Sequence, residues 1–369
     1  MAIVGRLIID ARWLYTGLGA YTEQLIRAVH ELANFPFALI TLPEHRDRLA
    51  PYSREIILSN ARLYSVREQF DILRAARAYD ILHVPHYNVP LLRRGTLLVS
   101  IHDLNHLLDP TMGRSLKTQL YARPMLRWAA ERADHIFTQS EYSKRKIIEH
   151  LGADPERITV TYTGVPPHIY SEPREEARTH TNRAFGFGGN YLLFVGNLKP
   201  HKNVLGLLKA FALLHRRNNF DYKLLIAGED RHWMPMLRRR AAELGLAGNV
   251  VFAGRATDDQ IRFAYSGADL TVVPSIEEGL GLPAIESMAC GTPVACSNAA
   301  SFPEVGGDAA EYFSPDSPES IASACENVLA NGERWRAMQQ AGHIQAAKFH
   351  WRECAARHIP VYRRFLSST

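Results

Sequence analysis

Two glutamates, Glu278 and Glu286, stand eight positions apart in the stretch PSIEEGLGLPAIESMACGTPV, which begins at Pro274. The glycines between them permit a tight turn, and Leu282-Pro283 suits the first turn of a helix. A helix that begins where a strand ends presents unpaired N–H groups and the positive end of its dipole, which can hold phosphate oxygens. Since carboxylates repel phosphate, the glutamates suit sugar hydroxyls instead, with Glu286 accepting from a ribose. By spacing alone, a capped helix with an incidental surface glutamate is the alternative.

The composition indicates a folded protein of two domains. The chain has 369 residues, of which 46% are hydrophobic, and its net charge is +5, with most of the excess before residue 165. This mild positive charge suits a phosphate-bearing ligand or an anionic membrane surface. Four cysteines without a C-x-x-C spacing argue against a zinc ribbon and favour a reducing cytosol. We find no secretory leader pattern and no apolar run of about 18 residues, so we expect a cytoplasmic protein with at most peripheral membrane contact.

Short apolar runs alternate with amphipathic runs in both halves of the chain. This alternation predicts parallel sheets with helices on both faces. Residues 166–189 are rich in Pro, Gly, Arg and Glu and are predicted to be a linker. We therefore predict two doubly wound Rossmann-like α/β domains, residues 1–165 and 190–349, that face each other across a ligand-binding cleft.

One segment of the N-terminal half combines cations with apolar residues. RSLKTQLYARPMLRWAAER, residues 114–132, could rest on an anionic bilayer, or it could pack its apolar stripe onto its own sheet. Pro124 is expected to kink or end this helix.

The stretch from Glu278 to Glu286 closely resembles the E-x7-E signature of the retaining family-4 glycosyltransferases, which have the GT-B fold. The resemblance extends in register over almost the whole chain. It includes the segments DARWLYTGLGAYTEQLIRA (10–28), SIHDL (100–104), SEYSKRKI (140–147), FVGNLKPHKNV (194–204) and SNAASFPEVGGDAAEYFSPDSPE (297–319). In this fold the last helix, here within residues 350–369, commonly crosses back to the first domain.

The resemblance implies roles for particular residues. Lys202 would hold the diphosphate of a nucleotide sugar, Glu278 the transferred sugar, and Glu286 the ribose. His102, at the end of the predicted strand TLLVSIHD, would contact the transferred sugar, although by itself it is more often structural. The backbone of the turn and helix start would line the diphosphate site, at Gly279, Leu280, Gly281 and Leu282. Gly19, in the turn TGLGAYT, would allow a phosphate or acceptor to approach closely.

The diphosphate site departs from the commonest family pattern at one position. Many members carry Arg where this chain has Asn197, so one cation is missing or supplied from elsewhere. Lys199, His201 or Arg255, which follows the FAG turn, are the candidates. No D-x-D sequence occurs in the chain, which agrees with a reaction in which Lys202 and helix N–H groups act without metal.

The resemblance thus predicts a metal-independent retaining glycosyltransferase without a cofactor. It would move a hexose from a nucleotide-diphosphate sugar, with GDP-mannose favoured, to a hydroxyl of a glycan or lipid-linked acceptor in surface polysaccharide synthesis. We expect no nucleic-acid partner, and a location in the cytoplasm or peripheral on the inner face of the plasma membrane. A non-catalytic sugar- or partner-binding protein is one alternative. A dinucleotide-dependent oxidoreductase is another, but TGLGAYTEQ lacks the third glycine of G-x-G-x-x-G.

Overall fold

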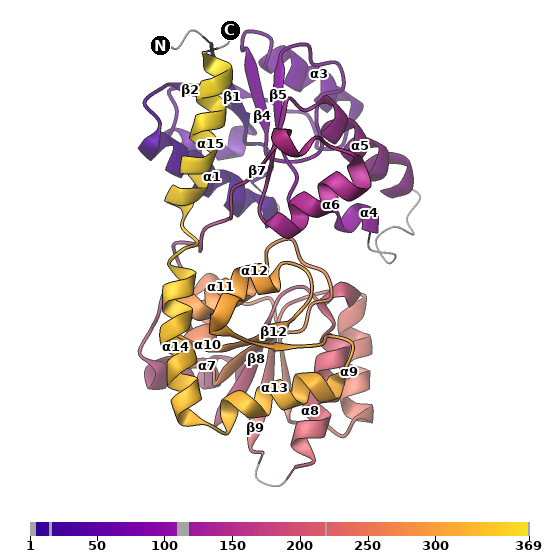
Figure 1. Ribbon diagram of the computed structural model, residues 1–369, viewed down its shortest axis with the longest axis vertical. Helices are drawn as coiled ribbons and strands as arrows, with labels where there is room; N and C mark the ends of the chain where they lie inside the picture. Colours follow the sequence, from indigo (N-terminus) through magenta and orange to yellow (C-terminus); the bar gives the residue numbers. More distant parts are fainter. Residues whose placement is uncertain (1–4, 15–16, 109–117, 218–219, 368–369) are drawn as a thin grey trace. The chain divides into compact units, whose positions relative to one another are not determined.

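The computed structural model describes residues 5–14, 17–108, 118–217 and 220–367. The chain divides into two compact units: unit 1 contains the residues up to Gly164 and those from His350 onward, and unit 2 is Val165–Phe349. Each unit is a parallel sheet with helices packed on both faces (Figure 1). The prediction of two doubly wound α/β folds is confirmed.

The sheet of unit 1 has the strand order β3-β2-β1-β4-β5-β6-β7. Its strands are β1 (Leu7–Asp10), β2 (Phe37–Thr41), β3 (Glu55–Leu58), β4 (Ile81–Val84), β5 (Thr96–Ser100), β6 (His135–Thr138) and β7 (Ile158–Val160). The chain first moves outward from β1 to β3 and then returns to add β4 on the other side of β1. The order therefore reverses between β1 and β4, which is where ligands bind in doubly wound sheets.

The helices of unit 1 form two layers. They are α1 (Gly17–Leu32), α2 (Arg46–Leu49), α3 (Val66–Ala75), α4 (Asn105–Leu108), α5 (Arg123–Arg132), α6 (Glu141–Leu151) and α15 (Trp351–Leu366), with short helices η1 (Pro43–His45), η2 (Thr118–Ala122) and η3 (Pro155–Arg157). Side chains alternate across β1, so Leu7 and Ile9 pack with α1 and α15, whereas Ile8 packs with α3, α5 and α6.

The sheet of unit 2 has the order β10-β9-β8-β11-β12-β13 and reverses between β8 and β11. Its strands are β8 (Asn190–Val195), β9 (Tyr222–Ala227), β10 (Val250–Gly254), β11 (Leu270–Val273), β12 (Val294–Ser297) and β13 (Ala310–Phe313). Its helices are α7 (Arg174–Phe185), α8 (Val204–His215), α9 (Trp233–Glu243), α10 (Asp258–Gly267), α11 (Leu282–Ala289), α12 (Phe302–Gly306), α13 (Pro318–Leu329) and α14 (Gly332–Ala346), with η4 (Pro200–Lys202) and η5 (Gly307–Ala309).

The last helix, α15, belongs to unit 1, where it lies beside α1 (Figure 1). Its buried Tyr362 hydroxyl bonds with Nδ1 of His83 on β4 at 2.8 Å, and Nε2 of His83 bonds with Oγ of Ser100 on β5 at 3.0 Å. This chain of hydrogen bonds fixes α15 on the sheet, because each buried polar group is satisfied by the next.

The predicted linker 166–189 is wrong in its central part, where α7 forms and packs on α10 in unit 2. The sequence pattern did not indicate this helix, because its two buried side chains, Ala177 and Thr181, are small. Polar contacts hold it instead: Arg174 and Arg178 donate to Oδ1 of Asp269 at 2.6 and 2.9 Å. Without an apolar stripe, a helix cannot be recognised by hydrophobic periodicity.

One further element, β3, differs from expectation. The four-residue edge strand β3 was not predicted, because half of its side chains are exposed and it lacks a buried apolar run. As expected, the helix is interrupted near Pro124: η2 ends at Ala122, and Pro124 lies in the first turn of α5. Residues 114–117 of the basic segment lie outside the described residues. No helix in the described part of the chain is long and apolar enough to cross a membrane.

Tyr362→Phe removes the hydroxyl that satisfies buried His83. We expect the free energy of unfolding to fall by about 1–3 kcal/mol, the cost of an unsatisfied buried polar group, as measured by urea denaturation. Tyr170→Phe is the matched control, since this tyrosine is 48% exposed and water can replace its hydroxyl. Equal stability of Tyr362→Phe and wild type would contradict the role given to this hydrogen bond.

Candidate functional site

The strand order of unit 2 brings Lys202 and Glu278 together. Lys202 ends the short helix η4, which follows β8, and Glu278 lies in the loop that follows β11. Because β8 and β11 are parallel neighbours, their carboxyl ends lie at the same edge of the sheet, at the point where the strand order reverses. Residues 76 positions apart therefore meet in space.

The two loops are also joined through their backbones. The Ile276 N–H donates to the carbonyl of His201 at 2.8 Å, which ties the start of the Glu278 loop to η4. Asn203 closes η4 in the left-handed conformation (φ 53°), and its Nδ2 donates to the carbonyl of Pro315 at 2.8 Å. The positions of Lys202 and Glu278 are therefore fixed by main-chain contacts as well as by their own interaction.

The Lys202 ammonium forms an ion pair with Oε2 of Glu278. The two side chains are 12% and 17% exposed, so they are largely but not fully withdrawn from water. At such a site an ion pair is screened less than at the surface, and loss of one partner leaves the other charge uncompensated. The pair neutralises a carboxylate that would otherwise repel an anionic ligand.

The helix start after Glu278 depends on Gly281. Gly281 has φ 86°, and a Cβ there would lie 2.7 Å from the ring of Phe302. Since glycine has no side chain, no side-chain cap covers the first turn of α11, and the positive end of its dipole remains available. Gly279 and Leu280 are buried beneath this turn, and Leu282 is half-buried at its start. The resulting arrangement of cation and helix N-terminus suits an anion.

Glu286 lies on the second turn of α11 and does not contact Lys202. The hydroxyl of Tyr265, fully buried on α10, donates to Oε2 of Glu286 at 2.9 Å. Burial raises the pKa of the Glu286 carboxyl, and the hydrogen bond from Tyr265 opposes that rise. Sequence reasoning missed Tyr265, because only the tertiary contact of α10 with α11 shows that it orients the glutamate.

The structure separates the candidate cations. Asn197 is exposed after β8, and its Oδ1 accepts the N–H of Lys199 at 3.2 Å, which shapes the turn leading to Lys202. Arg255 is exposed after β10, which is separated from β8 by β9. It does not join the pair of Lys202 and Glu278.

His102 lies in unit 1, at the carboxyl end of β5. Its Nε2 bonds with the carbonyl of Pro85 at 3.2 Å, and the ring of Tyr21 packs against it edge-on with centroids 4.4 Å apart. A carbonyl only accepts, so Nε2 carries the proton and Nδ1 is the acceptor nitrogen of the neutral ring. Burial lowers the pKa of His102, which keeps the imidazole uncharged near neutral pH.

The structure places Gly19 in the first turn of α1, and the approach of a phosphate or acceptor at this glycine stays a prediction. A Cβ at Gly19 would be 2.2 Å from the carbonyl oxygen of Leu14. The chain's own backbone therefore makes a close approach that requires glycine at this position.

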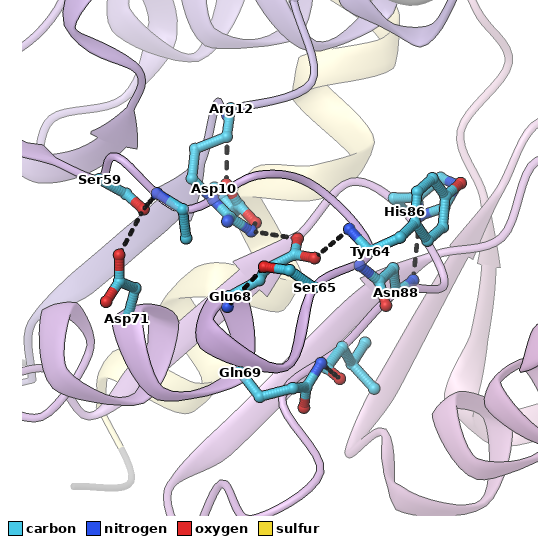
Figure 2. A network of polar contacts seen from close by, with 12 residues as sticks. Asp10, Arg12, Ser59, Tyr64, Ser65, Glu68, Gln69, Asp71, His86 and Asn88 are labelled. Carbon is cyan, nitrogen blue, oxygen red and sulfur yellow. Dashed lines mark hydrogen bonds and ion pairs between the residues drawn. The ribbon is translucent and has the colours of Figure 1, made fainter.

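A buried polar network at the end of β1 was not predicted (Figure 2). The fully buried Arg12 donates to both carboxylate oxygens of Asp10, at 2.8 and 2.7 Å, and to Oε1 of Glu68 on α3 at 3.0 Å. Glu68 in turn accepts the N–H of Tyr64, which has φ 61°. The signal available in the sequence was the D-x-R pattern directly after the buried strand LIID, and this network anchors α3 to the sheet.

Among the residues that the structure describes, no group of three or more His, Cys, Asp and Glu side chains could hold a metal ion.

Gly281→Ala should lower the free energy of unfolding by more than Gly186→Ala does. Both glycines have positive φ, but an added Cβ has no neighbour at Gly186 and meets Phe302 at Gly281. We expect about 1 kcal/mol for the left-handed conformation at Gly186 and about 1–3 kcal/mol more at Gly281, since its neighbour is a packed ring. Chemical denaturation measures both; equal losses would mean that the Phe302 contact imposes no constraint on the turn.

Comparison with known proteins assigns both units to glycosyltransferase families. Residues 15–168 match the family described as Glycosyltransferase Family 4, and residues 178–345 match Glycosyl transferases group 1. The chain is 30% identical to O-antigen chain mannosyltransferase B of Escherichia coli, over 94% of this chain and 96% of the relative. It is 27% identical to O-antigen chain mannosyltransferase RfbU of Salmonella typhimurium, over 85% and 87% of the two chains.

Solved structures with the same fold include two that cover nearly the whole chain. Sucrose-phosphate synthase from Thermosynechococcus elongatus has a TM-score of 0.78 at 20% identity, with 99% of this chain and 100% of that chain covered. Anabaena Alr3699/HepE in complex with UDP-glucose has a TM-score of 0.77 at 18% identity, with the same coverage.

Proposed function

This chain belongs to the family-4 glycosyltransferases and has the GT-B fold, and from that premise we propose that it is a mannosyltransferase of surface polysaccharide synthesis. It takes mannose from GDP-mannose and adds it, with retention of configuration, to a hydroxyl of a glycan or lipid-linked acceptor. The names of two relatives support the sugar and the pathway, because both are O-antigen chain mannosyltransferases. No observation favours the oxidoreductase or the non-catalytic alternative.

The observation that carries the proposal is the ion pair of Lys202 with Glu278 beside the uncapped start of α11. A diphosphate placed there meets an ammonium group and the positive end of a helix dipole. When the bond between the sugar and the diphosphate breaks, negative charge grows on the leaving group. Interactions that strengthen with this charge stabilise the transition state more than the ground state, which is the requirement for catalysis.

The ion pair also explains how a carboxylate can work next to a diphosphate. Lys202 lies between the two negative groups in this proposal and offsets their repulsion. Glu278 then accepts hydroxyls of the transferred sugar and steadies positive charge that develops at the sugar ring. As the diphosphate leaves, Lys202 can shift its interaction from Glu278 toward the diphosphate without crossing a large distance.

The remaining residues take supporting roles. Glu286, held by the Tyr265 hydroxyl through one oxygen, has its other oxygen for ribose hydroxyls. Lys199 is the better replacement for the arginine absent at position 197, since it belongs to the same turn as Lys202 whereas Arg255 follows a more distant strand. Neutral His102 would contact the transferred sugar from unit 1 without adding charge.

Lys202→Met and Glu278→Gln should separate the two roles. We expect Lys202→Met to raise KM for GDP-mannose and to lower kcat, with kcat/KM reduced about 10²–10³-fold, as when one preorganised electrostatic partner is removed. Glu278→Gln should lower kcat more than it weakens GDP binding. Lys209→Met, an exposed lysine on α8, is the control. Transfer rates close to wild type in both site variants would remove these assignments.

The donor is identified by thermal stability in the presence of GDP, UDP, ADP and their sugars. A ligand at 100 times its dissociation constant should stabilise the protein by about 2.7 kcal/mol. We expect GDP and GDP-mannose to raise the melting temperature and the others to raise it less, with the GDP shift reduced in Lys202→Met. A larger shift with UDP or ADP would refute GDP-mannose as the donor, but it would not contradict the assignment as a glycosyltransferase.

A further inference from the structure

One side of unit 1 carries an exposed surface that no step of sugar transfer uses. It is the outer side of the layer formed by α3, the segment 89–95 and α5, which we call the α3–α5 face. The inner side of this layer is buried against the sheet through Ile72 of α3, through Ala76 directly after α3, and through Leu126 and Ala129 of α5. The outer side is therefore fixed in orientation by the core beneath it.

Large apolar side chains project from this face. They are Val66 (77% exposed) and Phe70 (62%) on α3, Leu91 (39%) and Leu92 (71%) on the connecting segment, and Trp128 (38%) on α5. Single exposed apolar residues are normal on proteins, but several gathered on one face indicate a surface that contacts something else.

Hydrogen bonds between α3 and the connecting segment show that these residues share one face. Gln69 Nε2 donates to the carbonyl of Val89 at 3.2 Å, and Gln69 Oε1 accepts the N–H of Leu91 at 2.9 Å, so the connecting segment runs along α3 (Figure 2 shows Gln69 on α3). Arg93 continues this contact by donating to the carbonyl of Ala76 at 2.8 Å. On the other side, Leu91 and Trp128 line one small cavity of about 180 Å³.

The same face is rich in arginine. Six exposed arginines surround the apolar side chains: Arg67, Arg74, Arg77, Arg94, Arg127 and Arg132. Arg67, Phe70, Arg74 and Arg77 follow one another at spacings of three and four, so they form a single stripe of α3 and the turn after it. No ion pair links any of the six arginines to another residue within the described part of the chain.

Few acidic side chains are exposed on this face. Glu68 points inward to Arg12, and half-buried Asp71 accepts the Ser59 hydroxyl at 3.3 Å. Glu131 and Asp134 are the exposed acidic residues of α5 and the turn that follows it. The balance of exposed charge on the face is strongly positive.

We infer that the α3–α5 face docks on the surface of an anionic lipid bilayer. Guanidinium groups would pair with lipid phosphates, and Val66, Phe70 and Leu92 would enter the boundary between headgroups and acyl chains. Docking on a bilayer would bring the protein to the lipid-linked acceptor of the proposed function. The inferred membrane contact is a surface centred on α3, whereas the sequence indicated residues 114–132 alone.

Other occupants fit the face less well. A second copy of this chain in a symmetric dimer would set the same surface against itself and bring six arginines toward six arginines. A nucleic acid would pair with the arginines but would leave Val66 and Leu92 exposed to water. A bilayer with anionic lipid satisfies the charges and the aliphatic side chains together.

The test is co-sedimentation of the full chain with vesicles of phosphatidylcholine, alone or mixed in equal parts with phosphatidylglycerol. We expect binding to the mixed vesicles, weakened by salt, and little binding to phosphatidylcholine. Phe70→Ser/Leu92→Ser should weaken the partition coefficient about tenfold. Arg74→Gln/Arg77→Gln should weaken it about fivefold for each arginine removed, since each contributes to binding at an anionic surface.

Matched controls come from unit 2, where Ile344 is 70% exposed and Arg231 and Arg336 are exposed. Ile344→Ser and Arg231→Gln/Arg336→Gln should bind mixed vesicles like wild type, and melting temperatures confirm that all variants are folded. Equal binding by face and control variants, or equal binding to both vesicle types, would overturn the inference, as would a dimer that Phe70→Ser dissociates.

Mannosyl transfer to a water-soluble acceptor is measured separately. Failure of this transfer refutes the proposed function, while vesicle binding still decides the docking surface.

Discussion

The ion pair between Lys202 and Glu278 depends on one constraint, the adjacency of β8 and β11 at the reversal of the strand order. Any other order would place the two loops apart, however the residues were spaced in sequence. The backbone bond from Ile276 to His201 and the turn at Asn203 hold the two loops in register. Most of the conformational entropy of these groups is therefore lost in folding rather than in ligand binding.

The same reversal occurs in unit 1 between β1 and β4, but the residues there have a different chemistry. Arg12 is fully buried between Asp10 and Glu68, whereas Lys202 and Glu278 keep part of their surface in water. Breaking both ion pairs of a buried guanidinium in order to bind a ligand would cost too much free energy. The network in unit 1 is therefore structural, whereas the pair in unit 2 is the one that we propose exchanges partners with a ligand.

Helix α3 connects the structural network with the exposed arginine surface. Its inward face supplies Glu68 to Arg12 and Ile72 to the core, and its outward face carries Phe70 with arginines on either side. Because the inward carboxylate is held at two points, by Arg12 and by the Tyr64 N–H, the rotation of α3 is fixed. The orientation of the outer surface thus follows from polar contacts made on the other side of the helix.

The sequence by itself determined the alternation of strands and helices, the two units and the family, and it singled out Lys202, Glu278 and Glu286 as candidates, because periodicity and the E-x7-E block are local patterns. It did not determine α7, whose stability comes from contacts of Arg174 and Arg178 with a residue about 90 positions away, nor β3, whose partner is another strand. Only the tertiary structure decided that the backbone of Leu14 lies against Gly19, that Arg255 follows a strand not adjacent to β8, and that Tyr265 orients Glu286. The physical reason is the same in each case: the interaction joins residues distant in sequence, so its existence depends on how strands are ordered and helices packed.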